Sequence, residues 1–189
     1  MRKAVTLVLI LAAVWMLGVN SGGAGVLATD PAAMGAWQGT RLFDQTVFTV
    51  NLKANVDYAV YAPGSFSNSA VLGNPADPSN GSQYVYAYQV LNDQDGNRPV
   101  TQLSVGFLDM PPEGNSIDDA EVPENIGFVD GFASLDVDPD SSFNPDNDAL
   151  TTKQAANWAF AGTGLEPGTS DLSDILIYTS PHGPEWDAG

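Results

Sequence analysis

The sequence predicts an all-β protein: an antiparallel two-sheet β-sandwich (Ig-like or jelly-roll-like) that follows an N-terminal signal helix. Short segments of alternating apolar and polar residues recur every ten residues or so, with Gly, Pro, Asn and Asp between them. No segment sustains helical periodicity. A sandwich is favoured over a barrel because two sheets can each bury one apolar face and leave acidic turns at both ends.

The first residues have the pattern of a secretory signal. Arg2 and Lys3 precede a 16-residue apolar run, residues 4–19, and small residues follow. The run is shorter than the roughly 20 residues of a membrane-spanning helix, so a retained anchor is the less favoured alternative. Cleavage is expected after Ala24 or after Ala28.

This boundary divides the chain into a signal peptide, residues 1–28, and a single β-sandwich domain, residues 29–189. Removal of the signal changes the net charge from −17 to −19, because two bases and no acids leave. No stable membrane span is expected afterwards, and the protein is expected to be secreted or extracytoplasmic, at a bacterial cell surface or outside the cell.

The elements are expected in the following order. An irregular lead-in occupies residues 29–44, and 148–160 is the best, though weak, helical candidate. The strands expected are residues 46–52, 56–62, 84–91, 100–107, a short strand within 126–137, 157–162 and 174–179.

The segment "NDQDGN", residues 92–97, allows two interpretations. Asp93, Asp95 and Asn97 have the spacing of the first calcium ligands in a helix-loop-helix site. However, Arg and Ser occupy the positions where that motif needs Gly and Glu. We favour a type I′ turn at Asp95-Gly96 that joins strands 84–91 and 100–107, because both residues tolerate positive φ.

A second acidic segment is the stronger calcium candidate. Alternating carboxylates can direct several oxygens at one hard cation, which takes six to eight of them. The alternative is a solvated loop held by Asx turns. The predicted ligands are Asp136, Asp138, Asp140, Asp146 and Asp148.

Tyr84, Tyr86 and Tyr88 lie on one face of an expected strand. An exposed row of tyrosines would form a ligand-binding platform for carbohydrate or peptide. The favoured interpretation is a core face of the sandwich, because the opposite face of the strand is no more polar and large aromatic side chains are mostly buried.

Catalysis and nucleic-acid binding are not expected. The chain has no Cys and one His, His182, which lies between Pro and Gly as a turn residue. It has no G-x-S-x-G nucleophile motif, and any carboxylate pair among 23 acids can arise by chance. Six bases against 23 acids also disfavour nucleic acid as a partner.

Three segments carry a family resemblance: "VDYAVYAPGSF", "YVYAYQVLND" followed by "QLSVGF", and "SDILIYTSPHGPEWD". They resemble exported, exosortase-associated (PEP-CTERM-like) β-rich proteins of planctomycete-type bacteria. The resemblance implies a secreted β-rich domain. Many such proteins end in an apolar helix and a basic tail that direct sorting to the cell surface. Here only Asp-Ala-Gly follows Trp186, so anchoring by that route is not expected.

These observations lead to one main functional expectation and two alternatives. The main expectation is a secreted, non-catalytic structural or binding protein whose partner is a surface polysaccharide or a matrix protein. The first alternative is a calcium-assisted carbohydrate-binding module, for which calcium is the candidate cofactor. The second, less favoured, is a secreted hydrolase.

Overall fold

The computed structural model describes residues 25–92, 95–108, 124–132, 139–143, 153–167 and 172–184. This part of the chain is mostly β, and its helical elements are three short 3-10 turns, η1 to η3. None of its helices has the length and apolar character needed to cross a bilayer. The elements are η1 (Leu27–Thr29), η2 (Gly35–Trp37), β1 (Gln38–Val47), β2 (Val50–Tyr61), η3 (Phe66–Asn68), β3 (Tyr84–Asn92), β4 (Gln102–Leu108), β5 (Glu124–Val129), β6 (Pro139–Phe143), β7 (Lys153–Phe160) and β8 (Ile175–Ser180).

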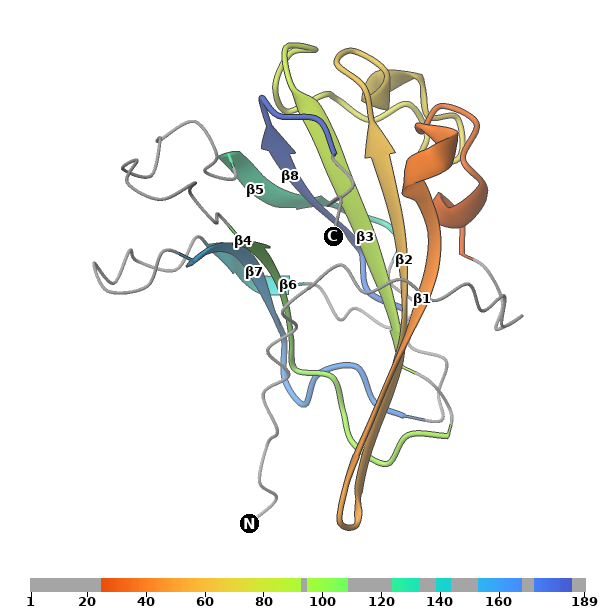
Figure 1. Cartoon of the computed structure of the whole chain (residues 1–189), viewed down its shortest axis with the longest axis vertical. Coiled ribbons are helices and arrows are strands. Elements are labelled where there is room, and N and C mark those ends of the chain that lie inside the picture. Colours follow the sequence, from red (N-terminus) through yellow and green to blue (C-terminus); the bar gives the residue numbers. More distant parts are fainter. Residues whose placement is uncertain are drawn as a thin grey trace.

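The strands form two antiparallel sheets (Figure 1). The larger has the order β1-β2-β3-β8-β5, and the smaller has the order β4-β7-β6. Most of the expected strands are confirmed in large part: 56–62 overlaps β2, 84–91 lies in β3, 100–107 overlaps β4, 157–162 overlaps the end of β7 and 174–179 overlaps β8. The short strand expected within 126–137 overlaps β5.

One hydrophobic cluster contains side chains from both sheets. Val56 of β2 and Val90 of β3 belong to it with Leu103 of β4 and Trp158 of β7. Trp158 is fully buried, and its indole Nε1 donates a hydrogen bond to the carbonyl oxygen of Gly127 at 2.7 Å. Because side chains alternate across a strand, the even-numbered residues of β2 and β3 face this cluster.

The opposite face of the larger sheet is also covered. Its odd-numbered side chains, such as Ala59 and Val85, pack with Leu27, Phe66 and Leu72 in a second cluster. Leu27 comes from the segment before β1, and Phe66 and Leu72 come from the loop between β2 and β3. The larger sheet is therefore apolar on both faces, which explains why β3 shows no polar side.

The expectation of one strand over residues 46–52 is wrong. Val47 at the end of β1 pairs with Val50 at the start of β2, so Phe48 and Thr49 form the turn of a long hairpin. The apolar-polar alternation continues through this turn without Gly, Pro or Asn, which is why the sequence pattern did not reveal it. The irregular lead-in expected at 29–44 is wrong only from residue 38 onward, because β1 begins at Gln38 and pairs with β2.

The Asp95-Gly96 hairpin is also wrong. β3 pairs with β2 and β8, whereas β4 pairs with β7 in the other sheet. The segment between β3 and β4 is therefore a crossover between sheets. The helical candidate at 148–160 contains β7 instead, because its apolar residues pack into the shared core as a strand partner of β4.

Candidate functional site

The β1–β2 hairpin extends beyond its neighbouring strands. β1 pairs with β2 along its whole length, down to Val47 and Val50. β3 pairs with β2 only from Ala54 onward. In the described part of the chain, the last turn of the hairpin therefore has no further strand beside it, and it projects from one end of the molecule (Figure 1).

Phe48 is the most exposed large apolar side chain in the part of the chain described. It lies at the first position of the two-residue turn with φ 56° and is 97% exposed. A two-residue hairpin turn needs positive φ there, a requirement that Gly meets without strain. For a bulky residue, such a conformation costs on the order of 1–3 kcal/mol. The protein thus keeps a strained backbone at a position that places an aromatic ring almost fully in water.

Asn97, in the crossover after β3, holds the hairpin tip in place. Its Nδ2 donates to the carbonyl oxygen of Thr49 at 2.9 Å, and its Oδ1 accepts from the backbone N–H of Asn51 at 2.9 Å. The backbone N–H of Asn97 also donates to the carbonyl oxygen of Asn51 at 2.8 Å. The backbone and side chain of Asn97 together take the place that a third strand would occupy beside the tip.

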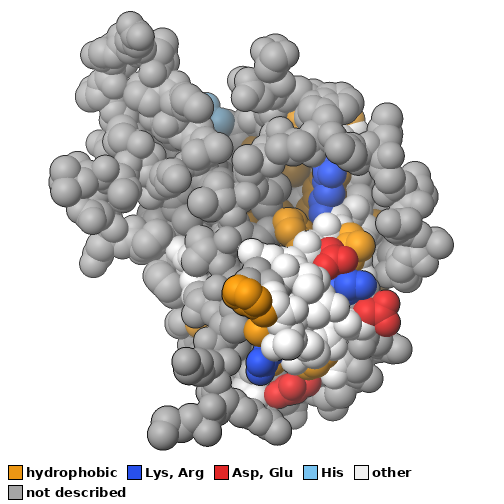
Figure 2. Space-filling model, turned by 60° about the horizontal axis from the view of Figure 1, so that its bottom comes forward, with side chains coloured by type: hydrophobic (Ala, Val, Ile, Leu, Met, Phe, Trp, Pro, Cys, Tyr) orange, Lys and Arg blue, Asp and Glu red, His pale blue; other side chains and the backbone are white. Residues whose placement is uncertain are grey.

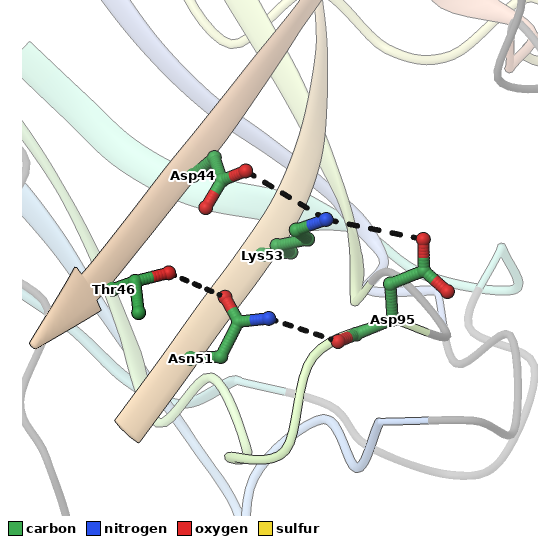
Figure 3. Close-up of polar contacts among 5 residues, drawn as sticks. All are labelled: Asp44, Thr46, Asn51, Lys53 and Asp95. Atoms are coloured by element: carbon green, nitrogen blue, oxygen red, sulfur yellow. Dashed lines mark hydrogen bonds and ion pairs between the residues drawn. The ribbon is translucent and has the colours of Figure 1, made fainter. Parts of the chain in front are cut away.

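Further polar contacts join the two strands of the hairpin to each other or join the hairpin to the crossover (Figure 3). Asn51 Nδ2 donates to the carbonyl oxygen of Asp95 at 3.1 Å, and Thr46 Oγ1 donates to Asn51 Oδ1 at 3.2 Å. Lys53 Nζ lies 3.7 Å from Asp44 Oδ2 and 3.9 Å from Asp95 Oδ2. Ion pairs as exposed as these stabilise little, about 0–1 kcal/mol, so the amide contacts of Asn97 and Asn51 are the main constraint on the tip.

The described side chains at this end of the molecule are mainly polar (Figure 2). Figure 2 shows this end of the molecule, where basic and acidic side chains lie among larger uncharged areas and a few hydrophobic groups. The side chains that hold the tip are mostly hydroxyls and amides, and the charge of Lys53 is shared between two carboxylates. An apolar ring on a convex, hydrogen-bonded support can insert into a complementary pocket of a partner, where its burial contributes roughly 1.5–3 kcal/mol.

The tyrosine row lies on the face of β3 that is turned toward the smaller sheet. Tyr88 belongs to the shared core and is 8% exposed, while Tyr84 and Tyr86 are half-buried. Tyr86 stacks on Tyr178 with ring centroids 4.7 Å apart, and its hydroxyl donates to the carbonyl oxygen of His182 at 2.9 Å. Burial raises the pKa of Tyr88 to about 12. The three rings do not share one exposed face.

The two segments considered as calcium sites, the acidic segment from Asp136 to Asp148 and the loop at residues 92–97, are described to different extents. Asp136, Asp138, Asp146 and Asp148 lie outside the described residues, and Asp140 lies in β6 without a described side chain, so that site stays a prediction. In the other candidate loop, both polar atoms of the Asn97 side chain already form hydrogen bonds to the hairpin. Among the residues with described placement, no three His, Cys, Asp or Glu side chains form a group suited to a metal ion.

Sequence reasoning missed both parts of the hairpin tip. The sequence indicates Asn97 only as a candidate calcium ligand, and it places Phe48 within the strand expected over residues 46–52. No turn-forming residue marks the loop at residues 48–49, so only the pairing of residues 38–47 with residues 50–61 reveals it. Comparison of the chain with protein-family models, curated protein sequences and solved structures gives no match in any of the three.

Proposed function

We propose that this is a secreted, non-catalytic binding protein of the cell surface or extracellular matrix, and that Phe48 at the hairpin tip is its main contact. The observation that carries the proposal is the combination of 97% exposure and φ 56° at Phe48. Folding alone disfavours both features, because exposed aromatic surface and positive φ each raise the free energy of the folded chain. Retention of both is typical of a residue that serves an interaction.

The shape of the tip favours a macromolecular partner with an apolar pocket. Small molecules bind in concave, mostly apolar sites, whereas Phe48 stands on a convex turn. Of the two expected partners, a matrix protein fits this shape better than a polysaccharide, which needs a flat platform or a groove. The scaffold that supports the tip is proposed to be a two-sheet β-sandwich of the Ig-like or jelly-roll-like kind, supported by the core cluster that both sheets share.

The test is to replace Phe48 by Gly. Gly adopts the positive φ freely and the exposed ring has little packing to lose, so the free energy of unfolding should rise by about 0.5–1 kcal/mol. The exported protein should at the same time lose its retention by the matrix proteins of the cells that produce it. Phe128→Ser is the matched control, because Phe128 is 41% exposed on β5 in another part of the molecule.

Three outcomes discriminate the alternatives. Retention that is lost in Phe48→Gly and kept in Phe128→Ser supports the proposal. Equal retention of both variants contradicts it, as does a fall in the melting temperature of Phe48→Gly, which would show that the ring stabilises the fold. A glycan array run with and without calcium serves as a parallel arm, and Phe48-independent glycan binding there would favour the carbohydrate-binding alternative.

A further inference from the structure

Residues 25–30 belong to the folded domain, although the expected signal peptide extends to residue 28. Leu27 is fully buried in the cluster on the outer face of the larger sheet. The carboxylate of Asp30 is also buried and accepts hydrogen bonds from the hydroxyls of Tyr61, at 2.7 Å, and Ser69. Cleavage after Ala28 would remove Leu27 from this cluster and leave a cavity, whereas cleavage after Ala24 would leave the cluster intact.

Gly25 lies directly against a buried carboxylate. Its backbone N–H donates a hydrogen bond to Asp57, which is 6% exposed in the middle of β2. A Cβ atom at position 25 would lie 2.1 Å from Asp57 Oδ2 and 3.1 Å from Gln89 Oε1. Only glycine therefore lets the chain approach this carboxylate so closely.

Among the described residues, the groups named here as neighbours of Asp57 carry no charge, and Thr40 and Gly25 donate hydrogen bonds to it. Thr40 Oγ1 on β1 donates to Asp57 Oδ1 at 2.5 Å, and Gln89 is the cross-strand neighbour on β3. Neither Thr40, Gln89 nor Gly25 has an ionisable side chain. Burial raises the pKa of Asp57, and the hydrogen bonds from Thr40 and Gly25 partly offset that effect. A buried carboxylate without a cation is costly, and a cation at this point would relieve the cost.

We propose that an endopeptidase cleaves the chain between Ala24 and Gly25, and that the new α-ammonium group of Gly25 forms an ion pair with Asp57. Water supplies the hydroxyl that completes the carboxyl group of Ala24 and the hydrogen that completes the amine of Gly25. The amine then takes up a proton from solvent. Ala24, directly before the cleaved bond, and Gly22, two residues further upstream, are the small residues that such a peptidase recognises.

Cleavage thereby adds an interaction to the folded domain that the uncleaved chain lacks. Before cleavage the nitrogen of Gly25 is an uncharged amide with one proton to donate, and afterwards it carries a full positive charge with three. Charge-assisted hydrogen bonds are roughly twice as strong as neutral ones. The mature chain should gain a fixed N-terminus at the sheet surface, independently of any role of Phe48.

In the first test, the complete chain is expressed and exported, and the N-terminus of the mature product is sequenced. This test requires no variant. The expected mature sequence begins Gly-Val-Leu-Ala-Thr, from Gly25. A mature chain that begins at Thr29, at Met1 or at any other residue overturns the proposal.

The second test measures the protonation of the Gly25 amine. The pH dependence of its acylation is followed by peptide mass mapping, with the side chain of Lys53 as an internal reference. The midpoint should lie about one pKa unit above that of the free peptide Gly-Val-Leu-Ala-Thr, equivalent to a tenfold lower fraction of free amine near neutral pH. The midpoint, unlike the rate, is insensitive to steric protection. In Asp57→Asn it should return to the peptide value. A midpoint equal to that of the peptide in the unsubstituted protein overturns the ion pair, whether or not the variant folds.

Discussion

Replacing Asn97 by Ala should loosen the hairpin tip without altering either sheet. The substitution removes the two side-chain hydrogen bonds, from Nδ2 to the carbonyl oxygen of Thr49 and from the N–H of Asn51 to Oδ1. It leaves the backbone bond between the N–H of Asn97 and the carbonyl oxygen of Asn51 in place. The contact between Asn51 Nδ2 and the carbonyl oxygen of Asp95 is also unaffected.

The expected loss follows from the number and exposure of these bonds. A net hydrogen bond contributes about 0.5–1.5 kcal/mol, and exposed bonds lie at the lower end because water replaces the lost partner. Two exposed bonds therefore correspond to about 1–2 kcal/mol. For a domain of this size each kcal/mol lowers the melting temperature by about 2–4 °C, so Asn97→Ala should melt some 2–8 °C lower.

Thermal melting and amide hydrogen exchange together test this reasoning. In Asn97→Ala the amide of Asn51 should exchange faster, because its acceptor is gone. In Asn97→Asp that amide should stay protected, since Oδ1 remains, while the contact with Thr49 is lost. Asn68→Ala, which removes one exposed side-chain hydrogen bond to Gly64, is the control and should leave the exchange of Asn51 unchanged. An unchanged melting temperature and unchanged Asn51 exchange in Asn97→Ala would refute the role of Asn97 as the clamp.

Three further outcomes are expected. Leu27→Ala should lower the free energy of unfolding by about 2–5 kcal/mol in denaturant titration, because it leaves a cavity in a fully buried site; a loss below 1 kcal/mol would contradict its place in the core. Because burial raises the pKa of Tyr88 to about 12 from an ordinary value of 10.0, the stability contributed by its neutral phenol is complete below pH 10 and is lost as pH rises through about 12. Tyr88→Phe should therefore lose less stability than the parent protein between pH 10 and 12 in pH-dependent melting, and identical pH profiles would contradict this. Calcium at a hundredfold excess over its dissociation constant should stabilise the domain by about 2.7 kcal/mol, more than magnesium or matched sodium, and Asp138→Ala combined with Asp140→Ala should abolish the difference; equal melting temperatures in all salts would refute the site.

The sequence predicted strands well where the hydrophobic pattern is local. Residues 56–62 and 84–91 alternate because each strand presents one side chain to each face of the sheet, and this period is visible without knowing any partner. The same reasoning failed at Phe48, because a turn that uses Phe and Thr interrupts neither the alternation nor the β-propensity. A strained turn residue has no signature in composition; it becomes visible only when its two flanking strands are seen to pair.

The sequence by itself determined the β class, the large excess of acidic over basic residues and the exclusion of thiol chemistry, since each depends only on residue type and short-range spacing. Only the tertiary structure decided that β3 pairs with β8 rather than with β4, and that Asn97 supports a hairpin whose contact residues lie 46 and 48 positions earlier in the chain. An alternating strand can pair equally well with many others, so its partner is selected by which arrangement buries all apolar faces at once. It likewise decided that Leu27 is a core residue and that Gly25 meets Asp57, because contacts between distant segments form only when the chain packs against itself.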